Sequence, residues 1–132
     1  MDKTRRAVQL VVTVKDEPGM LAEISTVLAK EHINIEAINA YGDEGEAIFY
    51  IIVRDNEKAK KALKAKGWDV KEEEIIVLDL ANKPGNLNKV ALKLQKLGVN
   101  LRYCYGTTSA SGPSHFVLKA TDNDLAAKAL KD

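Results

Sequence analysis

Apolar positions along the chain follow two spacings, one typical of strands and one typical of helices. Residues 7–14 (AVQLVVTV) are apolar and rich in β-branched side chains, which predicts a largely buried strand. A helical spacing follows, and its apolar face carries Met20, Leu21, Ile24, Val27 and Leu28. Residues 34–41 and 46–53 then predict two strands joined by the glycine-bearing hairpin connection GDEG.

A second helix and a closing strand complete this pattern. The helix is predicted to run to Ala65, with Asp55 or Asn56 as its cap and Gly67 after its end. Residues 68–73 (WDVKEE) predict a short closing strand. The order βαββαβ is typical of a ferredoxin-like α+β unit, with an antiparallel sheet and both helices on one face.

The same pattern recurs in the second half of the chain. Pro84 and Gly85 lie 66 residues after Pro18 and Gly19. The same shift pairs further apolar and polar positions, namely Leu21 with Leu87, Leu28 with Leu94, Asn34 with Asn100 and Ile35 with Leu101. After one extra residue in the hairpin, DNEKAKKAL (55–63) aligns with DNDLAAKAL (122–130). The chain is therefore predicted to be two copies of one unit, with domains at 1–72 and 73–132.

The second copy is shorter than the first. It starts with EIIVLDL (74–80), and only Lys131 and Asp132 follow its second predicted helix, which leaves no sequence for a closing strand. Either the second sheet is one strand short, or another segment or chain supplies that strand. An unpaired strand edge favours pairing with whatever strand is available.

The turn before the first helix of each copy can bind an anion. Pro and Gly before a helix leave backbone N–H groups free at the positive end of the helix dipole. Gly19 and Gly85 lack a Cβ and allow a close approach to the backbone. Asn34 and Asn100 begin the next predicted strand, and an Asn side chain both donates and accepts hydrogen bonds.

An α-amino acid needs this combination of groups, donors for its carboxylate and oxygen acceptors for its ammonium. In the first copy Asp16 and Glu17 can contact the ammonium. The equivalent positions in the second copy are Asn82 and Lys83, which suit a cation less well. We therefore expect the two sites to differ.

The stretches DEPGMLAEISTVLAKEHINI (16–35) and NKPGNLNKVALKLQKLGVNL (82–101) resemble the D-x-P-G-x-L … G-[IV]-N-I signature of ACT domains, which are small βαββαβ regulatory modules. The resemblance covers nearly the whole chain as two tandem copies. The chain departs from the signature at Asn82, where the family usually has Asp, and at His32, where it commonly has Gly.

The resemblance implies binding of a free amino acid at an interface between paired ACT domains. It also implies a free-standing regulatory protein that has no catalytic activity and signals to an unidentified partner protein. The residues that it places at the ligand are Asp16, Glu17, Pro18, Gly19, Met20, Leu21 and Asn34 in the first copy, and Asn82, Lys83, Pro84, Gly85, Asn86, Leu87 and Asn100 in the second.

Composition adds several expectations. The chain has 132 residues, 45% of them hydrophobic, which is enough for a globular core. Twenty basic and 19 acidic residues give a net charge of +1, which argues against a protein that binds nucleic acid by neutralising phosphates. The cluster DKTRR (2–6) is interpreted as a solvated terminus. One cysteine and no long apolar run indicate a cytoplasmic protein without a membrane span.

Catalytic and metal-binding chemistry find little support in the sequence. His32, His115 and Cys104 lack metal-ligand spacing, and no cofactor is expected. Tyr103, Cys104 and Tyr105 are interpreted as packing residues. Ser109, Ser111 and Ser114 belong to a Gly/Ser hairpin without a paired base. Two alternatives remain open: a structural module that binds no ligand, and a small α+β enzyme.

The strand AIFYIIV (47–53) is apolar on both faces, with Phe49, Ile51 and Val53 on one and Ile48, Tyr50 and Ile52 on the other. A sheet with helices on one face should instead alternate with polar residues. The second face is therefore predicted to be covered, most simply by another copy of the chain in a homodimer.

Overall fold

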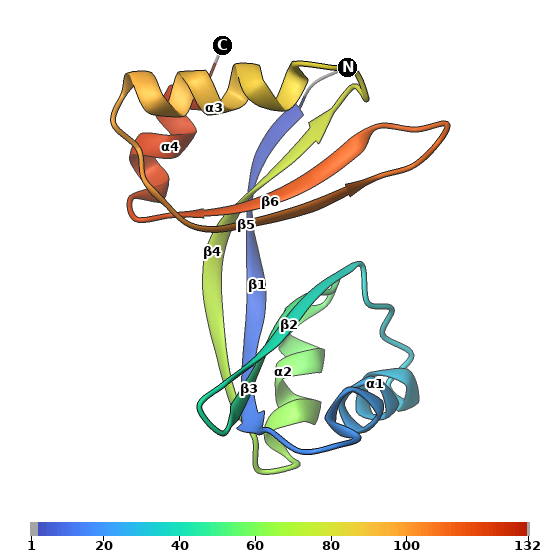
Figure 1. The fold of residues 1–132 in the computed structure, drawn as a ribbon. Coiled ribbons are helices and arrows are strands. Elements are labelled where there is room, and N and C mark those ends of the chain that lie inside the picture. Colours follow the sequence, from blue (N-terminus) through green and yellow to red (C-terminus); the bar gives the residue numbers. More distant parts are fainter. Residues whose placement is uncertain (1–2, 132) are drawn as a thin grey trace. The chain divides into compact units, whose positions relative to one another are not determined.

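The computed structural model describes residues 3–131, which form two compact units. The first unit is Val8–Glu73, and the second combines residues 3–7 with residues 74–131. The helices and strands are, in chain order, β1 (Lys3–Lys15), α1 (Met20–Lys30), β2 (Ala37–Asp43), β3 (Glu46–Ile52), α2 (Asn56–Lys64), β4 (Asp69–Leu80), α3 (Asn86–Lys96), β5 (Leu101–Thr108), β6 (Ser114–Ala120) and α4 (Asn123–Leu130) (Figure 1).

The strands follow the order β2-β3-β1-β4-β6-β5. The β3 strand pairs antiparallel with both β1 and β2, and β6 pairs antiparallel with both β4 and β5. The predicted α+β class and antiparallel pairing are therefore confirmed. The β2–β3 hairpin turns through Glu44 and Gly45, which both have positive φ (49° and 86°), as a type I′ turn requires.

Two long strands contribute to both units. Residues 3–7 of β1 belong to the second unit and the rest of β1 to the first, while β4 passes from the first unit into the second at Glu74. The predicted strands 68–73 and 74–80 are thus one strand. After α4 the described chain adds no strand, and residues 3–7 join the second unit in its place. Because residues 3–7 belong to the second unit, the observed units differ from the division into residues 1–72 and 73–132.

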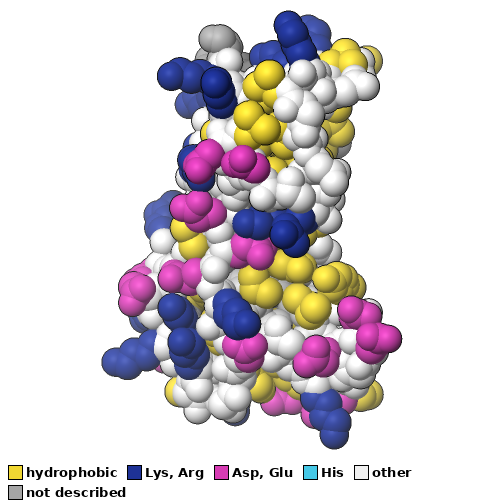
Figure 2. All heavy atoms as spheres, turned by 90° about the vertical axis from the view of Figure 1, so that its left-hand side faces the viewer, with side chains coloured by type: hydrophobic (Ala, Val, Ile, Leu, Met, Phe, Trp, Pro, Cys, Tyr) yellow, Lys and Arg dark blue, Asp and Glu magenta, His cyan; other side chains and the backbone are white. Residues whose placement is uncertain are grey.

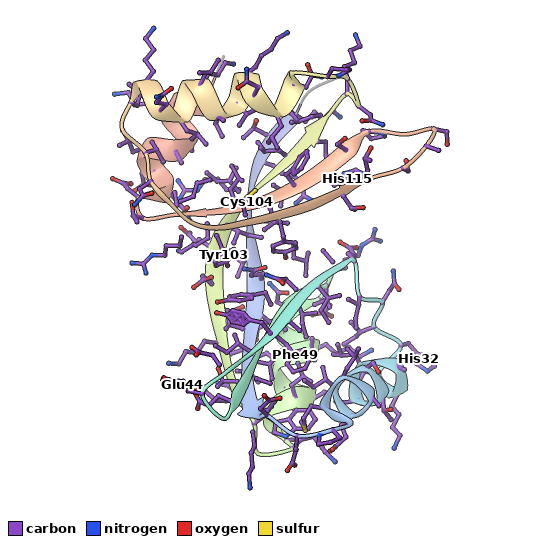
Figure 3. All side chains as sticks on the ribbon, in the orientation of Figure 1. His32, Glu44, Phe49, Tyr103, Cys104 and His115 are labelled. Carbon is purple, nitrogen blue, oxygen red and sulfur yellow. The ribbon has the colours of Figure 1, made fainter. Side chains whose placement is uncertain are left out.

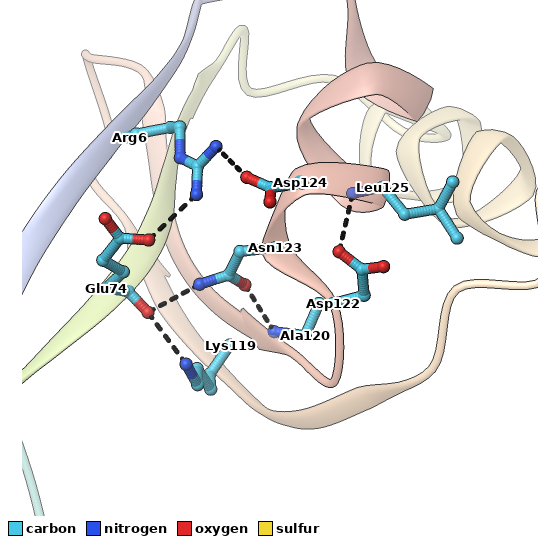
Figure 4. Close-up of polar contacts among 8 residues, drawn as sticks. All are labelled: Arg6, Glu74, Lys119, Ala120, Asp122, Asn123, Asp124 and Leu125. Atoms are coloured by element: carbon cyan, nitrogen blue, oxygen red, sulfur yellow. Dashed lines mark hydrogen bonds and ion pairs between the residues drawn. The ribbon is translucent and has the colours of Figure 1, made fainter.

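The N-terminal residues are held to the second unit by side-chain contacts. The Arg6 guanidinium donates to Glu74 Oε1 at 2.9 Å and to Asp124 Oδ1 at 2.6 Å (Figure 4). These carboxylates raise the pKa of Arg6, with the hydrogen bond to Asp124 as the main cause. The side chains of residues 3–6 are exposed, in agreement with the predicted solvated terminus, and the structure adds that these residues lie in β1. Asp2 lies outside the described residues.

The second helix of each unit begins in the same way. Asp55 Oδ1 accepts from the Lys58 N–H at 3.1 Å, and Asp122 Oδ1 accepts from the Leu125 N–H at 3.0 Å. The following asparagines tie these helices to the sheet. Asn56 Nδ2 donates to the Val8 carbonyl, and Asn123 Nδ2 donates to the Glu74 carbonyl at 2.7 Å. Asp55 is therefore the cap, and Asn56 has a different role.

Each unit has its own apolar core. In the first, Leu10, Val12, Phe49 and Ile51 from the sheet pack with residues of both helices. Leu21 does not join them, because it is 56% exposed while Met20, Ile24 and Leu28 are buried. In the second unit the core is built from Ile76, Leu78, Leu80, Leu94, Leu118, Ala120, Ala126 and Leu130.

The first helix of each unit ends in a Schellman motif. His32 follows α1 (Figure 3) and has φ 59°. Its N–H donates to the Ala29 carbonyl, and the Ile33 N–H donates to the Leu28 carbonyl. The equivalent residue in the second unit is Gly98, at φ 68°. Left-handed backbone costs about 1–2 kcal/mol for a residue that carries a Cβ, so His32 is strained where Gly98 is not.

Charged side chains of both signs are interspersed on the face shown in Figure 2. Within residues 3–131, none of the helices combines the length and the apolar character that crossing a bilayer requires.

Replacing His32 by glycine should stabilise the protein, because glycine adopts the left-handed conformation without steric cost. We expect His32→Gly to raise the free energy of unfolding by about 1 kcal/mol and the melting temperature by about 4 °C. Gly98→Ala is the matched control and should lower both by similar amounts. A melting temperature unchanged in both variants would show that the two turns do not have the conformations described.

Removing residues 1–7 should loosen the second unit in particular. The deletion leaves one side of β4 without its neighbour, so amide hydrogen exchange in residues 74–80 should accelerate more than in residues 46–52. Arg6→Gln keeps the strand and removes only solvent-exposed ion pairs, so its exchange should stay close to that of the intact chain. If the amides of residues 74–80 exchanged equally slowly with and without residues 1–7, the role of this N-terminal segment as a strand of the second unit would be contradicted.

Candidate functional site

The first helix of each unit begins at a glycine with left-handed backbone. Gly19 has φ 90° and Gly85 has φ 88°, values that only glycine adopts readily. No side chain caps either helix, and the two glycine carbonyls accept from Glu23 N at 2.9 Å and Lys89 N at 3.0 Å. A Cβ built on either glycine would meet no neighbouring atom within 4 Å. Both helix starts are therefore open to a ligand that approaches the backbone.

In the first unit, Asp16 connects this turn to the β2–β3 hairpin. Its N–H donates to the Gly45 carbonyl at 3.0 Å. Its carboxylate lies against Gly42, where a Cβ would be only 2.6 Å from Asp16 Oδ2. Glu17, Pro18 and Leu21 are exposed, while Met20 is 6% exposed and part of the core. The first turn thus has acidic groups on its outside and a filled interior.

In the second unit, the equivalent region contains a pocket of about 300 Å³. It lies where β4 ends and α3 begins, beside the end of β5 and the start of β6. Its lining residues are Leu80, Ala81, Asn82, Lys83, Asn86, Leu87, Thr107, Thr108, Ser114 and Phe116. Four of the predicted site residues, Asn82, Lys83, Asn86 and Leu87, are therefore brought together in one cavity.

Hydrogen bonds hold the polar residues of this pocket in place. Asn86 Nδ2 donates to the Ala81 carbonyl at 2.7 Å, and the Lys83 N–H donates to the same carbonyl at 2.9 Å. Asn82 Nδ2 donates to the Ser109 carbonyl at 3.5 Å, and Asn82 Oδ1 accepts from Ser114 Oγ at the same distance. The loop is thereby tied to the β5–β6 hairpin.

Single replacements account for the difference between the two turns. Asn86 occupies the position of Met20, and a half-buried polar side chain therefore replaces a core methionine. The cross-strand pair Gly42–Ala47 of the first unit corresponds to Thr108–Ser114 in the second, which adds two hydroxyl groups. The second turn is consequently hollow and hydroxyl-rich, whereas the first is filled by Met20 and by the Asp16 carboxylate.

Asn34 and Asn100 lie at the other end of their helices. The eleven residues of α1 span about 16 Å, which separates Gly19 from Asn34 within one unit. Asn34 instead lines a larger cavity, of about 450 Å³, with His32, Ile33, Glu36, Arg54, Asp55 and Lys58. The prediction that Asn34 begins a strand is wrong, since β2 starts at Ala37; Asn100 directly precedes β5.

Thr107, Thr108, Ser114 and Phe116 line the second pocket without having been predicted as site residues. They lie far from the loop in sequence and reach it through the pairing of β6 with β4 and of β5 with β6. Phe116 covers Gly106, because a Cβ on Gly106 would overlap the Phe116 ring and lie 2.6 Å from the His115 carbonyl oxygen. Only strand pairing brings these side chains to the pocket.

The remaining titratable groups form no catalytic arrangement that we recognise in the described residues. Burial raises the pKa of the Cys104 thiol, which favours the unreactive protonated form. Burial also raises the pKa of Tyr105 to about 12, and its ring stacks with Tyr103 at a centroid distance of 6.4 Å. His115 Nδ1 lies 2.6 Å from Asp79 Oδ1, and the His115 side chain is 57% exposed. In residues 3–131 no cluster of His, Cys, Asp and Glu could hold a metal ion.

Comparison with known proteins identifies the family. The ACT domain model matches residues 8–66, which cover the first unit from β1 through α2. The chain therefore contains an ACT domain. No curated protein matches this chain.

Solved structures similar to this ACT-domain protein cover nearly all of it. Protein BT0572 from Bacteroides thetaiotaomicron is 31% identical, with a TM-score of 0.89 over 96% of this chain and 88% of that one. The ligand-free regulatory subunit of aspartate kinase from Thermus thermophilus is 17% identical, with a TM-score of 0.66 over 96% and 95%. The corresponding subunit from Thermus flavus is 18% identical, with a TM-score of 0.63 over 97% and 93%. The two Thermus subunits share the fold.

The close contact at Gly106 should make this position sensitive to a single added methyl group. In Gly106→Ala, the new methyl meets both the Phe116 ring and a backbone oxygen, and overpacking of this kind costs about 1–3 kcal/mol. In Gly42→Ala, the methyl meets only the Asp16 carboxylate, which can rotate away. We expect denaturant unfolding to show the larger loss of stability for Gly106→Ala. Equal losses would contradict the described positions of Phe116 and Asp16.

Proposed function

We propose that this ACT-domain protein is a regulatory protein without catalytic activity, which binds a free amino acid and passes its occupancy to a partner protein. The pocket at the start of α3 carries this proposal, because it combines uncapped helix N–H groups with side-chain oxygens and one cation. Those are the groups that a carboxylate and an ammonium require. The fold shared with regulatory subunits of aspartate kinase is compatible with such a role.

The second unit is proposed to be a second ACT domain, duplicated from the first, with the domains of the chain divided near residue 73. Several local features support this duplication. The left-handed helix starts, the Asp55 and Asp122 caps, and the asparagines that tie the second helices to the sheet all recur at shifts of 66 or 67 residues.

A homodimer is proposed as the assembly that completes the ligand site. Within one unit Gly19 and Asn34 lie at opposite ends of α1, and the same holds for Gly85, Asn100 and α3. A ligand that contacts both a glycine turn and an asparagine of this kind therefore needs a second domain, which another copy of the chain can provide. The ligand would then favour one arrangement of the domains through its differential affinity, and this is how it would signal to the partner. A reducing, cytoplasmic location is proposed from the single cysteine.

A thermal-shift screen with the twenty amino acids tests this function. A ligand that binds only the folded state at 100 times its Kd stabilises that state by about 2.7 kcal/mol, so at least one amino acid should raise the melting temperature. Asn34→Ala and Asn100→Ala should reduce the shift. Asn88→Ala, at an exposed position of α3 outside the pocket, should keep it.

Sedimentation of the same samples at micromolar concentration tests the assembly, and a dimer is expected. If none of the twenty amino acids changes the melting temperature, the chain is better described as a structural module that binds no ligand.

A further inference from the structure

We propose that the amino acid binds in the second-unit pocket alone, one per chain, and that this pocket selects a small, uncharged side chain. This inference rests on the proposed function and specifies which of the two predicted sites is used. It starts from a difference that the repeat itself reveals, a cavity at one turn and a buried methionine at the other.

The position of Asn86 determines whether the turn is hollow. In the first unit Met20 occupies this position, is 6% exposed and packs in the core. In the second unit the Asn86 side chain turns back to the Ala81 carbonyl at 2.7 Å and lines the pocket. Since Asn86 Nδ2 is used in that bond, its Oδ1 is the atom able to accept from a ligand ammonium.

The charges of the lining residues define how a ligand would be oriented. Lys83 is the only charged residue among them, and no carboxylate is present. The Asn86 N–H already donates to the Lys83 carbonyl at 3.2 Å, so the ligand carboxylate is expected near the Lys83 ammonium and the Leu87 N–H, and the ligand ammonium near Asn86 Oδ1. The side chain of a lysine or arginine ligand would bring a second positive charge that no lining carboxylate neutralises.

Size and polarity restrict the ligand further. A volume of about 300 Å³ corresponds to roughly ten water molecules, which suits an amino acid of about ten non-hydrogen atoms or fewer. Leu80, Leu87 and Phe116 offer apolar contacts to its side chain, and Thr107, Thr108 and Ser114 offer hydroxyl groups. Small aliphatic and hydroxyl side chains match this lining.

Isothermal titration calorimetry on the intact chain tests the inference, with serine, threonine and valine as probes and lysine and arginine as the comparison. We expect one site per chain, and binding of at least one small probe that is tenfold or more tighter than that of either basic amino acid. Asn86→Met places the first-unit residue in the second-unit pocket and should abolish binding. Asn88→Met makes the same chemical change at an exposed position of the same helix and should leave binding unchanged.

Lys83→Gln provides a second variant at an exposed position, in case Asn86→Met fails to fold. It should weaken binding of the small probes about tenfold, because a charge-assisted hydrogen bond is lost. Two equivalents per chain, or binding that survives both Asn86→Met and Lys83→Gln, would overturn the inference and leave the proposed function standing. Preference for lysine or arginine would do the same. Failure of all twenty amino acids to bind would overturn both.

Discussion

The second unit of this protein depends on a strand segment from a distant part of the sequence. This unit combines residues 74–131 with residues 3–7 of β1, which lie about 120 residues before α4 in the chain. Strand edges carry backbone N–H and C=O groups that require partners, so the second unit depends on the N-terminus of the chain for a complete sheet. Its core of β4, β6, α3 and α4 residues packs on that sheet.

The sheet positions the starts of α1 and α3, which a ligand can approach. Glycine in the left-handed region begins both α1 and α3 and leaves their first N–H groups without a side-chain cap. The strands then supply the surroundings. In the first unit they present Ala47 and Gly42, the latter against the Asp16 carboxylate, and in the second they present Thr108 and Ser114. One scaffold therefore produces an acidic, filled turn and a hydroxyl-rich, hollow one.

This asymmetry fits the proposal that one of the two units binds the ligand and the other supports the structure. The first copy keeps the ACT signature residues Asp16 and Gly19, and the family model matches this part of the chain, but Met20 fills its interior. The second copy departs from the signature at Asn82 and contains the pocket. Agreement with a family motif and availability of a cavity are thus separate properties, because the motif describes the loop while the cavity depends on the side chains beneath it.

The sequence by itself determined the local elements and their recurrence. Apolar spacing, the Pro-Gly turns and the Asp55 and Asp122 caps act over a few residues, so the helices and most strand positions could be predicted from them. The extent of β1, the exposure of Leu21 and the roles of Thr108, Ser114 and Phe116 could not. Only the tertiary structure decided these, because they depend on strand pairing and packing between residues far apart in the chain, and local propensity carries no information about such contacts.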